Sequence, residues 1–265
     1  ADSLQESVLP SSGVALPIAW GDLGAKLVEV GAVDPAKLET LYKDRGGFPP
    51  DFRKMLAPLE AKPLTGLEKN ANEKIIITSS NAGYLLNLLW ALGLANKNVI
   101  LEDKSEMMNP AYGGAGNFAS TGGWTLSYGD AMEHYGKHKL ILLTGEQQEL
   151  VDRISRNIYR PCCGNSTHFP DCNHGMAMLG LLELMASQGV GEQDMYKTAL
   201  AVNSYWFPET YLTIAAYMQQ KGVDWKNVSA QEMLSANYSS SSGYQDISSK
   251  VTQPPQGTGG GGCSA

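Results

Sequence analysis

Long hydrophobic runs and clusters of basic residues are both missing from this chain of 265 residues. Its most apolar stretch, residues 82–95, is interrupted by Asn87 and Gly93 and falls short of the roughly 18 residues that a membrane-spanning helix needs. Lys and Arg are scattered singly and the formal net charge is −7, which excludes the basic surface typical of nucleic-acid-binding proteins. We therefore expect neither a membrane span nor a nucleic-acid partner.

Several motifs with known chemistry are absent as well. The chain has no G-x-x-x-x-G-K-[ST], no H-E-x-x-H, no G-x-S-x-G and no C-x-x-C-H for covalent haem. Gly114 and Gly116 lack the third glycine and the preceding strand of a dinucleotide-binding fingerprint. The sequence thus carries no motif of a common enzyme class, and a protein that is not an enzyme is the favoured interpretation.

Helical periodicity dominates what is present. Capping boxes at Thr144 and Ser229 each begin a helix, and an i, i+4, i+7, i+11 apolar stripe marks the helix that contains Met195. We predict a mainly α fold, an irregular helical domain of about seven to nine helices joined by long ordered loops. Helices are expected over residues 20–30, 34–46, 84–94, 144–159, 174–187, 192–206, 209–220 and 229–236.

A minor β element is expected beside the helices. Residues 75–77 and 99–101 are short apolar runs rich in β-branched side chains, so the two runs could pair as a small sheet. Residues 107–129 are dense in Gly, Asn and Ser, which predicts a long ordered loop.

The two ends of the chain differ in composition from the middle. Residues 1–17 are polar and contain Pro and Ser, which predicts an exposed leader of the kind left after signal-peptide cleavage. Residues 239–265 are rich first in Ser and then in Gly, which predicts a tail that carries Cys263. Residues 18–238 are then a single helical domain, and we expect the protein to be exported, as a periplasmic, cell-surface or extracellular protein.

The one concentration of reactive side chains lies between Cys162 and His174. Three of the four cysteines and two of the four histidines fall in this segment. The segment after it is apolar on nearly every side, with Glu183 as its one charged residue, which indicates a buried helix. Cys172 lies where this helix begins, with Asp171 or Asn173 as the expected cap, and free amide groups there favour a thiolate.

Thiolate and imidazole ligands together suit copper or zinc. The spacing C-C-x8-C-x-H lacks the C-x2-C pair of common zinc sites, although Gly164 permits the bend that two adjacent cysteines need to reach one ion. We predict a soft-metal-binding protein, with a homo-oligomer formed through the tails as a further expectation. The candidate ligands are Cys162, Cys163, Cys172, His174, His168 and Cys263.

Disulfide formation is the first alternative use of the same cysteines. Cysteines of exported proteins are usually oxidised, and a bond between the adjacent Cys162 and Cys163 would close a strained ring. One of the two would then pair with Cys172 and the other with Cys263. This alternative predicts a disulfide-stapled structural or self-assembling protein that holds no metal.

A thiol enzyme or a redox-centre protein is the second alternative. Cys172 would be the nucleophile, with His168 or His174 as the base and Asp171 orienting that base. Residues so close in sequence seldom reach the geometry of such a triad. A haem or another redox centre held by the same side chains is equally compatible with the pattern.

His134 and His138 form a separate pair at i, i+4 spacing. On a helix the two rings would share one face and could chelate an ion. Gly136 and Lys137 between them weaken the helix and favour a solvated surface instead.

Overall fold

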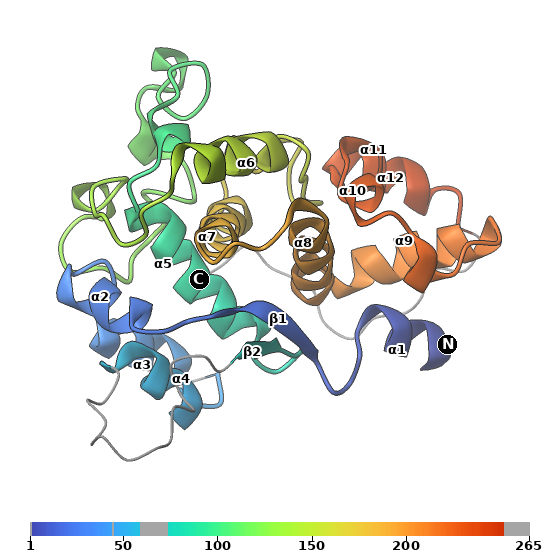
Figure 1. The fold of residues 1–265 in the computed structure, drawn as a ribbon, viewed down its shortest axis with the longest axis horizontal. Helices are drawn as coiled ribbons and strands as arrows, with labels where there is room; N and C mark the ends of the chain where they lie inside the picture. The colour runs from blue at the N-terminus through green and yellow to red at the C-terminus, as the bar shows by residue number, and fades with distance from the viewer. Residues whose placement is uncertain (1, 44, 59–73, 252–265) are drawn as a thin grey trace.

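The computed structural model describes residues 2–43, 45–58 and 74–251. This part of the chain contains twelve α-helices and one two-stranded sheet (Figure 1). The prediction of a mainly α fold with a minor β element is confirmed. The α-helices are more numerous than expected because short ones also form in the predicted leader, over residues 50–56 and in the predicted tail.

Two apolar helices form the centre of the core. Helix α5 (Ala82–Ala95) packs along α7 (Asn173–Ser187), which Figure 1 shows nearly end-on in the middle of the molecule. Both helices carry apolar side chains on almost every face and are buried, as expected for α7. A Cβ added at Gly93 would lie 2.1 Å from the Met176 carbonyl oxygen, and one at Gly180 would lie 2.4 Å from that of Leu89. These glycines therefore permit direct backbone contact between the helices.

Three further helices enclose this pair. Helix α6 (Gly145–Ser155) packs on α7, and α8 (Glu192–Trp206) contacts α5, α7 and α9 (Pro208–Gln220). The capping box at Thr144 is confirmed, since its hydroxyl accepts from the Gln147 amide while the Gln147 side chain accepts from the Thr144 amide. The predicted stripe of α8 is buried along its length, at Met195, Ala199, Val202 and Trp206.

The remaining helices are short. On one side of the core lie α2 (Leu23–Glu29), α3 (Pro35–Lys43) and α4 (Pro50–Leu56), and on the other α10 (Ala230–Met233), α11 (Ala236–Ser239) and α12 (Ser241–Ser248) (Figure 1). The expected loop over residues 107–129 contains only short 3-10 helices, and it contacts the core where the Trp90 indole donates to the Ser120 carbonyl at 2.6 Å.

One of the two strands of the sheet was not predicted from the sequence. Strand β2 (Lys74–Ile77) forms in one expected run, but its antiparallel partner is β1 (Val14–Ala19), with Val14 opposite Ile77. The predicted partner run is wrong, because Val99–Glu102 is a 3-10 helix. The Asn98 side chain accepts from the Ile100 amide at 3.0 Å and caps that helical turn.

Both predicted ends need correction. Instead of an exposed leader, α1 (Asp2–Val8) and β1 bury Val8 and Leu16, because α1 packs on α9 and β1 pairs with β2. The beginning of the predicted tail is helical, and α12 buries Ile247. The rest of that tail, including Cys263, lies outside the described residues.

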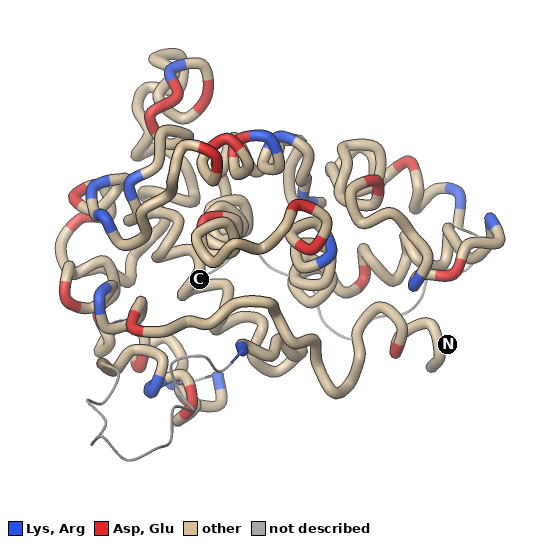
Figure 2. Tube along the Cα trace, viewed as in Figure 1, with Lys and Arg blue, Asp and Glu red and all other residues tan. Residues whose placement is uncertain are grey.

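Two predictions concern the surface. No helix in the described part of the chain is both long and apolar enough to cross a membrane. Acidic and basic residues are interspersed along the trace (Figure 2), in line with the scattered charges of the sequence.

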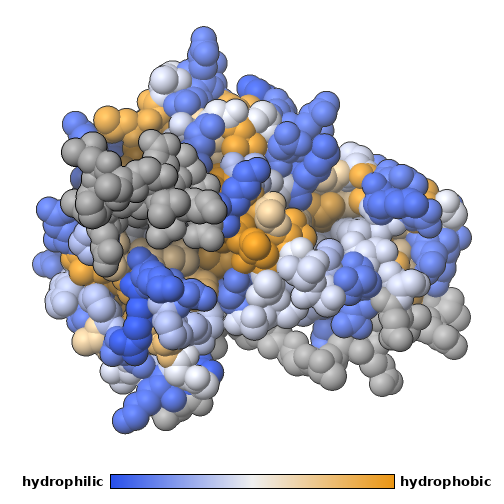
Figure 3. All heavy atoms as spheres, turned by 60° about the horizontal axis from the view of Figure 1, so that its bottom comes forward, coloured by the Kyte–Doolittle hydropathy of each residue, from blue (hydrophilic) through white to orange (hydrophobic). Residues whose placement is uncertain are grey.

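Large apolar side chains exposed among the described residues come from separate segments: Ile76, Val99, Met108, Tyr112, Tyr128 and Leu142. One face also shows an apolar area near its middle (Figure 3).

Candidate metal centre

The cysteine loop connects the end of α6 to the start of α7. The chain turns back on itself just after α6, where Tyr159 and Ser166 form an antiparallel bridge and the Thr167 amide donates to the Ile158 carbonyl at 2.8 Å. The residues between these partners form a tight excursion that places Cys162 beside the N-terminus of α7. Backbone pairing thus brings together cysteines that lie ten residues apart in the chain.

Three thiols converge at this point. The Sγ atoms of Cys162, Cys163 and Cys172 all lie within 4.8 Å of one another, and those of Cys162 and Cys172 are 3.5 Å apart. All three cysteines are free and only partly exposed. Since a zinc–sulfur bond of about 2.3 Å places tetrahedral sulfurs about 3.8 Å apart, the cluster is close enough to hold a metal ion.

Arg160 organises the loop from inside. Its side chain is 2% exposed and donates from Nε to Cys172 Sγ at 2.9 Å. Its Nη1 donates to the Asn165 carbonyl at 3.1 Å, and Nη2 donates to the Phe169 carbonyl at 2.9 Å and to Asp171 Oδ1 at 2.6 Å. A planar guanidinium therefore ties the loop backbone, a carboxylate and a sulfur together. Nothing in the sequence distinguished Arg160 from the other scattered basic residues.

Gly175 provides the space for this guanidinium. A Cβ at this position would lie 2.4 Å from Arg160 Cζ. The Gly175 amide also donates to Cys172 Sγ at 3.4 Å, so Cys172 itself is the N-cap of α7. This corrects the expected cap. Asp171 is engaged by Arg160 and by the Asn165 side chain at 2.9 Å instead.

The surroundings separate the acidities of the three thiols. Side-chain hydrogen bonds from Cys162 and Cys163, assisted by Arg160 and His174, hold the pKa of Cys172 well below its usual range. Hydrogen bonds with Cys163 and Cys172, together with burial, raise the pKa of Cys162. For Cys163, a hydrogen bond with Cys162 acts to lower the pKa, but Cys172 and burial outweigh it and raise the pKa to about 11. Among the three thiols, the surroundings therefore favour the thiolate form at Cys172.

The charge of Arg160 is maintained by its partners. Burial disfavours the charged form, but electrostatic interactions with Cys172, Cys163 and Asp171 raise the pKa of Arg160 above its ordinary value. The residue therefore stays a cation in a site that is otherwise anionic.

The two predicted histidine ligands are placed differently. His174 is buried, packs its ring on Phe207 with centroids 4.4 Å apart, and has a buried Nδ1 without a hydrogen-bond partner among the described residues. His168 contacts α6, with Nε2 2.8 Å from Asp152 Oδ1 and 2.8 Å from Arg156 Nη2. Of the predicted ligands, the structure brings together the three cysteines and places His174 next to Cys172, whereas His168 belongs to a separate ion-pair cluster.

The His134 and His138 pair is not on a helix. Gly136 adopts a φ of +61°, and the rings meet with His134 Nδ1 3.0 Å from His138 Nε2. His134 Nε2 lies 2.8 Å from the Tyr128 carbonyl oxygen. Burial, followed by the neighbouring charges of His134 and Lys137, lowers the pKa of His138. The two imidazoles thus satisfy each other as hydrogen-bond partners.

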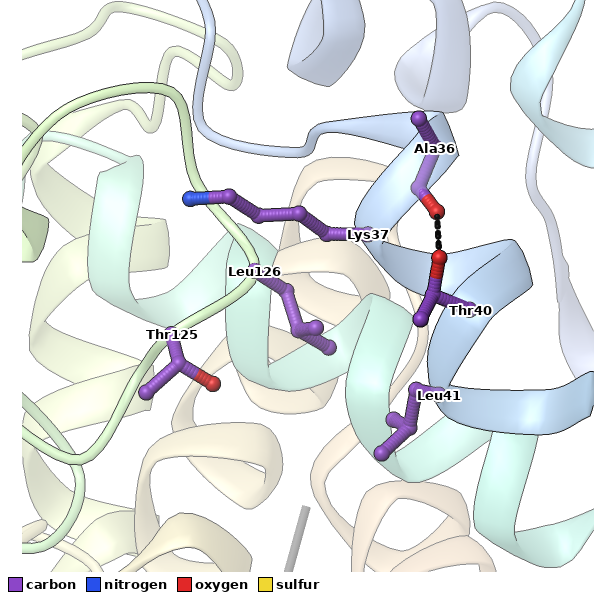
Figure 4. A pocket seen from close by; sticks show the side chains of 6 residues that line it. All are labelled: Ala36, Lys37, Thr40, Leu41, Thr125 and Leu126. Atoms are coloured by element: carbon purple, nitrogen blue, oxygen red, sulfur yellow. Dashed lines mark hydrogen bonds between the residues drawn. The ribbon is translucent and has the colours of Figure 1, made fainter. Parts of the chain in front are cut away.

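A shallow hollow of about 400 Å³ lies between α3 and residues 125–126 (Figure 4). Two of its polar side chains are already engaged, since Lys37 Nζ donates to the Ser127 carbonyl at 2.7 Å and the Thr40 hydroxyl donates to the Ala36 carbonyl at 2.9 Å. No cysteine, histidine or carboxylate lines it. The thiol cluster is therefore the stronger candidate for function.

Fold and site together define a mainly helical protein with a three-cysteine cluster that can hold a metal ion. No protein-family model, curated protein or solved structure matches the chain. The function is consequently argued from the geometry of the cluster.

Proposed function

We propose that the protein binds one thiophilic metal ion, copper or zinc, through Cys162, Cys163 and Cys172. The observation that carries this proposal is the convergence of three free Sγ atoms within 4.8 Å. Three thiols this close together cannot all ionise without a cation, since the charge on one opposes ionisation of the others. A bound cation removes that conflict by accepting all three as thiolates.

The charges around the cluster favour zinc over copper. Three thiolates with a divalent ion carry one net negative charge, and with Cu(I) they carry two. Arg160 supplies one buried positive charge against Cys172, and it already pairs with Asp171 at 2.6 Å. Because uncompensated buried charge is expensive, the divalent ion gives the better-balanced site.

His174 is the best candidate for a fourth ligand. It lies two residues after Cys172, contributes to lowering the pKa of that thiol, and keeps its buried Nδ1 free of other partners. Three Cys and one His form a common ligand set of structural zinc sites. Asp171 is less suitable because Arg160 and Asn165 occupy its carboxylate. Cys263, the other fourth ligand that we predicted, stays a prediction.

The competing functions have less structural support than metal binding. The described cysteines are free, and a disulfide staple needs an oxidation step. A triad built on Cys172 lacks His168 as its base, because that ring is held by Asp152 and Arg156. Export and assembly through the tails remain predictions from the sequence.

Cobalt(II) substitution tests the proposal. Reduced, metal-free full-length protein is titrated with Co(II) and then with Zn(II), and the visible spectrum is recorded. One equivalent of Co(II) should give the intense bands of a tetrahedral thiolate site, and Zn(II) should displace it. Cys163→Ser and Cys172→Ser should each weaken binding by at least about 100-fold.

Matched variants identify the fourth ligand. His174→Gln should weaken Co(II) binding and shift its bands, whereas Cys263→Ser should leave both unchanged. The reverse pattern would assign the fourth position to Cys263. Absence of stoichiometric binding of Co(II), Zn(II) and Cu(I) to the reduced protein would overturn the proposed function.

A further inference from the structure

Two of the three thiols are placed to react with each other. Cys162 Sγ lies 3.5 Å from Cys172 Sγ, and a disulfide requires about 2.05 Å, so a shift of about 1.5 Å closes the bond. Cys163 Sγ also lies within 4.8 Å of Cys172 Sγ, but it contacts the Asn165 carbonyl oxygen at 3.9 Å and Asp171 Oδ1 at 3.9 Å. Geometry therefore distinguishes the two adjacent cysteines as partners for Cys172.

The loop is held in this arrangement before any reaction. Arg160 is hydrogen-bonded to the backbone at Asn165 and Phe169, and the Cys163 carbonyl accepts from the Ser241 amide at 2.9 Å. Prior positioning of this kind raises the effective concentration of one reacting group beside another by many orders of magnitude. The pair should therefore close far faster than two thiols on a mobile loop.

We propose that Cys172 and Cys162 form a dithiol that exchanges with low-molecular-weight disulfides, with Cys172 as the attacking sulfur and Cys162 as the resolving one. The guanidinium Nε at 2.9 Å and the Gly175 amide at 3.4 Å are placed to stabilise charge on Cys172 Sγ. This activity goes beyond metal binding and does not depend on it.

The exchange balances in two steps. Cys172 Sγ, after losing its proton, attacks one sulfur of a disulfide RSSR, forms a mixed disulfide, and releases the other half as RSH with that proton. Cys162 Sγ then attacks Cys172 Sγ, and the second half leaves with the Cys162 proton as RSH. The protein dithiol is oxidised and RSSR is reduced to two RSH.

One consequence does rest on the proposed function. Closing this disulfide removes two of the three proposed thiolate ligands, so the oxidised protein would not retain the metal ion. Cys163 would remain as a single thiol. Reduction by RSH would restore the full ligand set.

The test uses full-length Cys263→Ser protein, reduced and kept metal-free with a chelator, and treated with oxidised glutathione. Intact-mass spectra are recorded over time, and circular dichroism confirms that each variant is folded. With the added Cys163→Ser change, the product should be an internal disulfide that has lost two hydrogens. With Cys162→Ser in its place, the mixed disulfide with glutathione on Cys172 should accumulate, because Cys163 is expected to close onto Cys172 only slowly.

The internal disulfide should form at least about tenfold faster in Cys163→Ser than in Cys162→Ser. Equal rates of internal closure, or a mixed disulfide that accumulates on Cys163 of the Cys162→Ser variant and not on Cys172, would overturn the proposal. Co(II) binding by the same reduced proteins is measured separately, so a failure of exchange and a failure of metal binding are distinguishable.

Discussion

Two buried ionisable side chains, Arg160 and Glu183, differ in their charge state. Arg160 stays charged because a sulfur, a carboxylate and two carbonyls surround it. Glu183 is fully buried in the middle of α7 and has one strong contact, from the Asn98 amide at 2.5 Å, while its Oε2 has no partner among the described residues. Burial raises the pKa of Glu183 to about 8, which makes it a neutral acid at physiological pH.

The raised pKa of Glu183 predicts a stability that depends on pH. Between the ordinary glutamate value of about 4.3 and the folded value of about 8, the folded state binds one proton more than the unfolded state. Stability should therefore be fully present below this window and fall as pH rises through it. Glu183→Gln should remove that decline and raise the free energy of unfolding at pH 7 by about 3 kcal/mol.

Urea unfolding at pH 5, 6, 7 and 8 measures this effect. Glu149→Gln, an exposed change on α6, is the matched control and should keep the pH dependence of the unchanged protein. An identical slope against pH in Glu183→Gln and in the unchanged protein would show that Glu183 is not the titrating group.

The packing of α5 against α7 positions the cysteine cluster. Cys172 caps α7, and the position of α7 depends on the backbone contact at Gly93 and Gly180. Propensity alone disfavours glycine inside a helix, so these residues are present for close approach and not for helix formation. The two core helices thus determine the position of the cysteine side chains, two of which lie in the loop before α7.

Substitution at the crossing should be costly. Gly180→Ala would place a Cβ 2.4 Å from the Leu89 carbonyl oxygen, and that backbone atom cannot rotate away. We expect a loss of about 1 to 3 kcal/mol in the free energy of unfolding. Gly83→Ala is the control, since a Cβ there meets no atom within 4 Å and should stabilise α5 by up to about 1 kcal/mol. Equal effects of the two changes in thermal unfolding would argue against close contact at Gly180.

The cysteine loop is a junction between distant parts of the molecule. His168 ties it to Asp152 on α6 at 2.8 Å, and the Ser241 amide at the start of α12 donates to the Cys163 carbonyl at 2.9 Å. Asn203 on α8 donates to the Tyr159 carbonyl at 3.2 Å. An ion held by this loop should therefore stabilise the C-terminal helices as well as the loop.

Metal removal is expected to act over this whole junction. At a free ion concentration about 1,000 times Kd, binding contributes about 4 kcal/mol, which corresponds to roughly 8 to 16 °C in the unfolding midpoint. A chelator should lower the midpoint by that amount and increase amide exchange over residues 158–175 and 236–248. Exchange in α5 serves as the internal reference. An unchanged midpoint in Cys172→Ser on chelation, with a drop in the unchanged protein, would locate the effect at the cluster.

Much of the architecture follows from local patterns. Three of the confirmed features depend on residues three to fifteen positions apart, which is the range over which a helix forms. They are the capping box at Thr144, the apolar stripe of α8 and the apolar character of α7 on all sides. The same is true of the cysteine cluster, since its members lie close together in the chain. These features could be predicted without the fold.

Contacts between distant segments decided the rest. The pairing of β1 with β2 joins residues about sixty positions apart. The polar composition of α1 gave no sign of a helix that packs on the core, and only the fold shows that α1 contacts α9 and that Val8 is buried. Three features depend on which groups the folded backbone brings within 4 Å. They are the 3.5 Å approach of Cys162 Sγ to Cys172 Sγ, the burial of Arg160 and the contact of His168 with α6. Composition sets which side chains can react, but only packing sets the distances and local charges that determine which of them do.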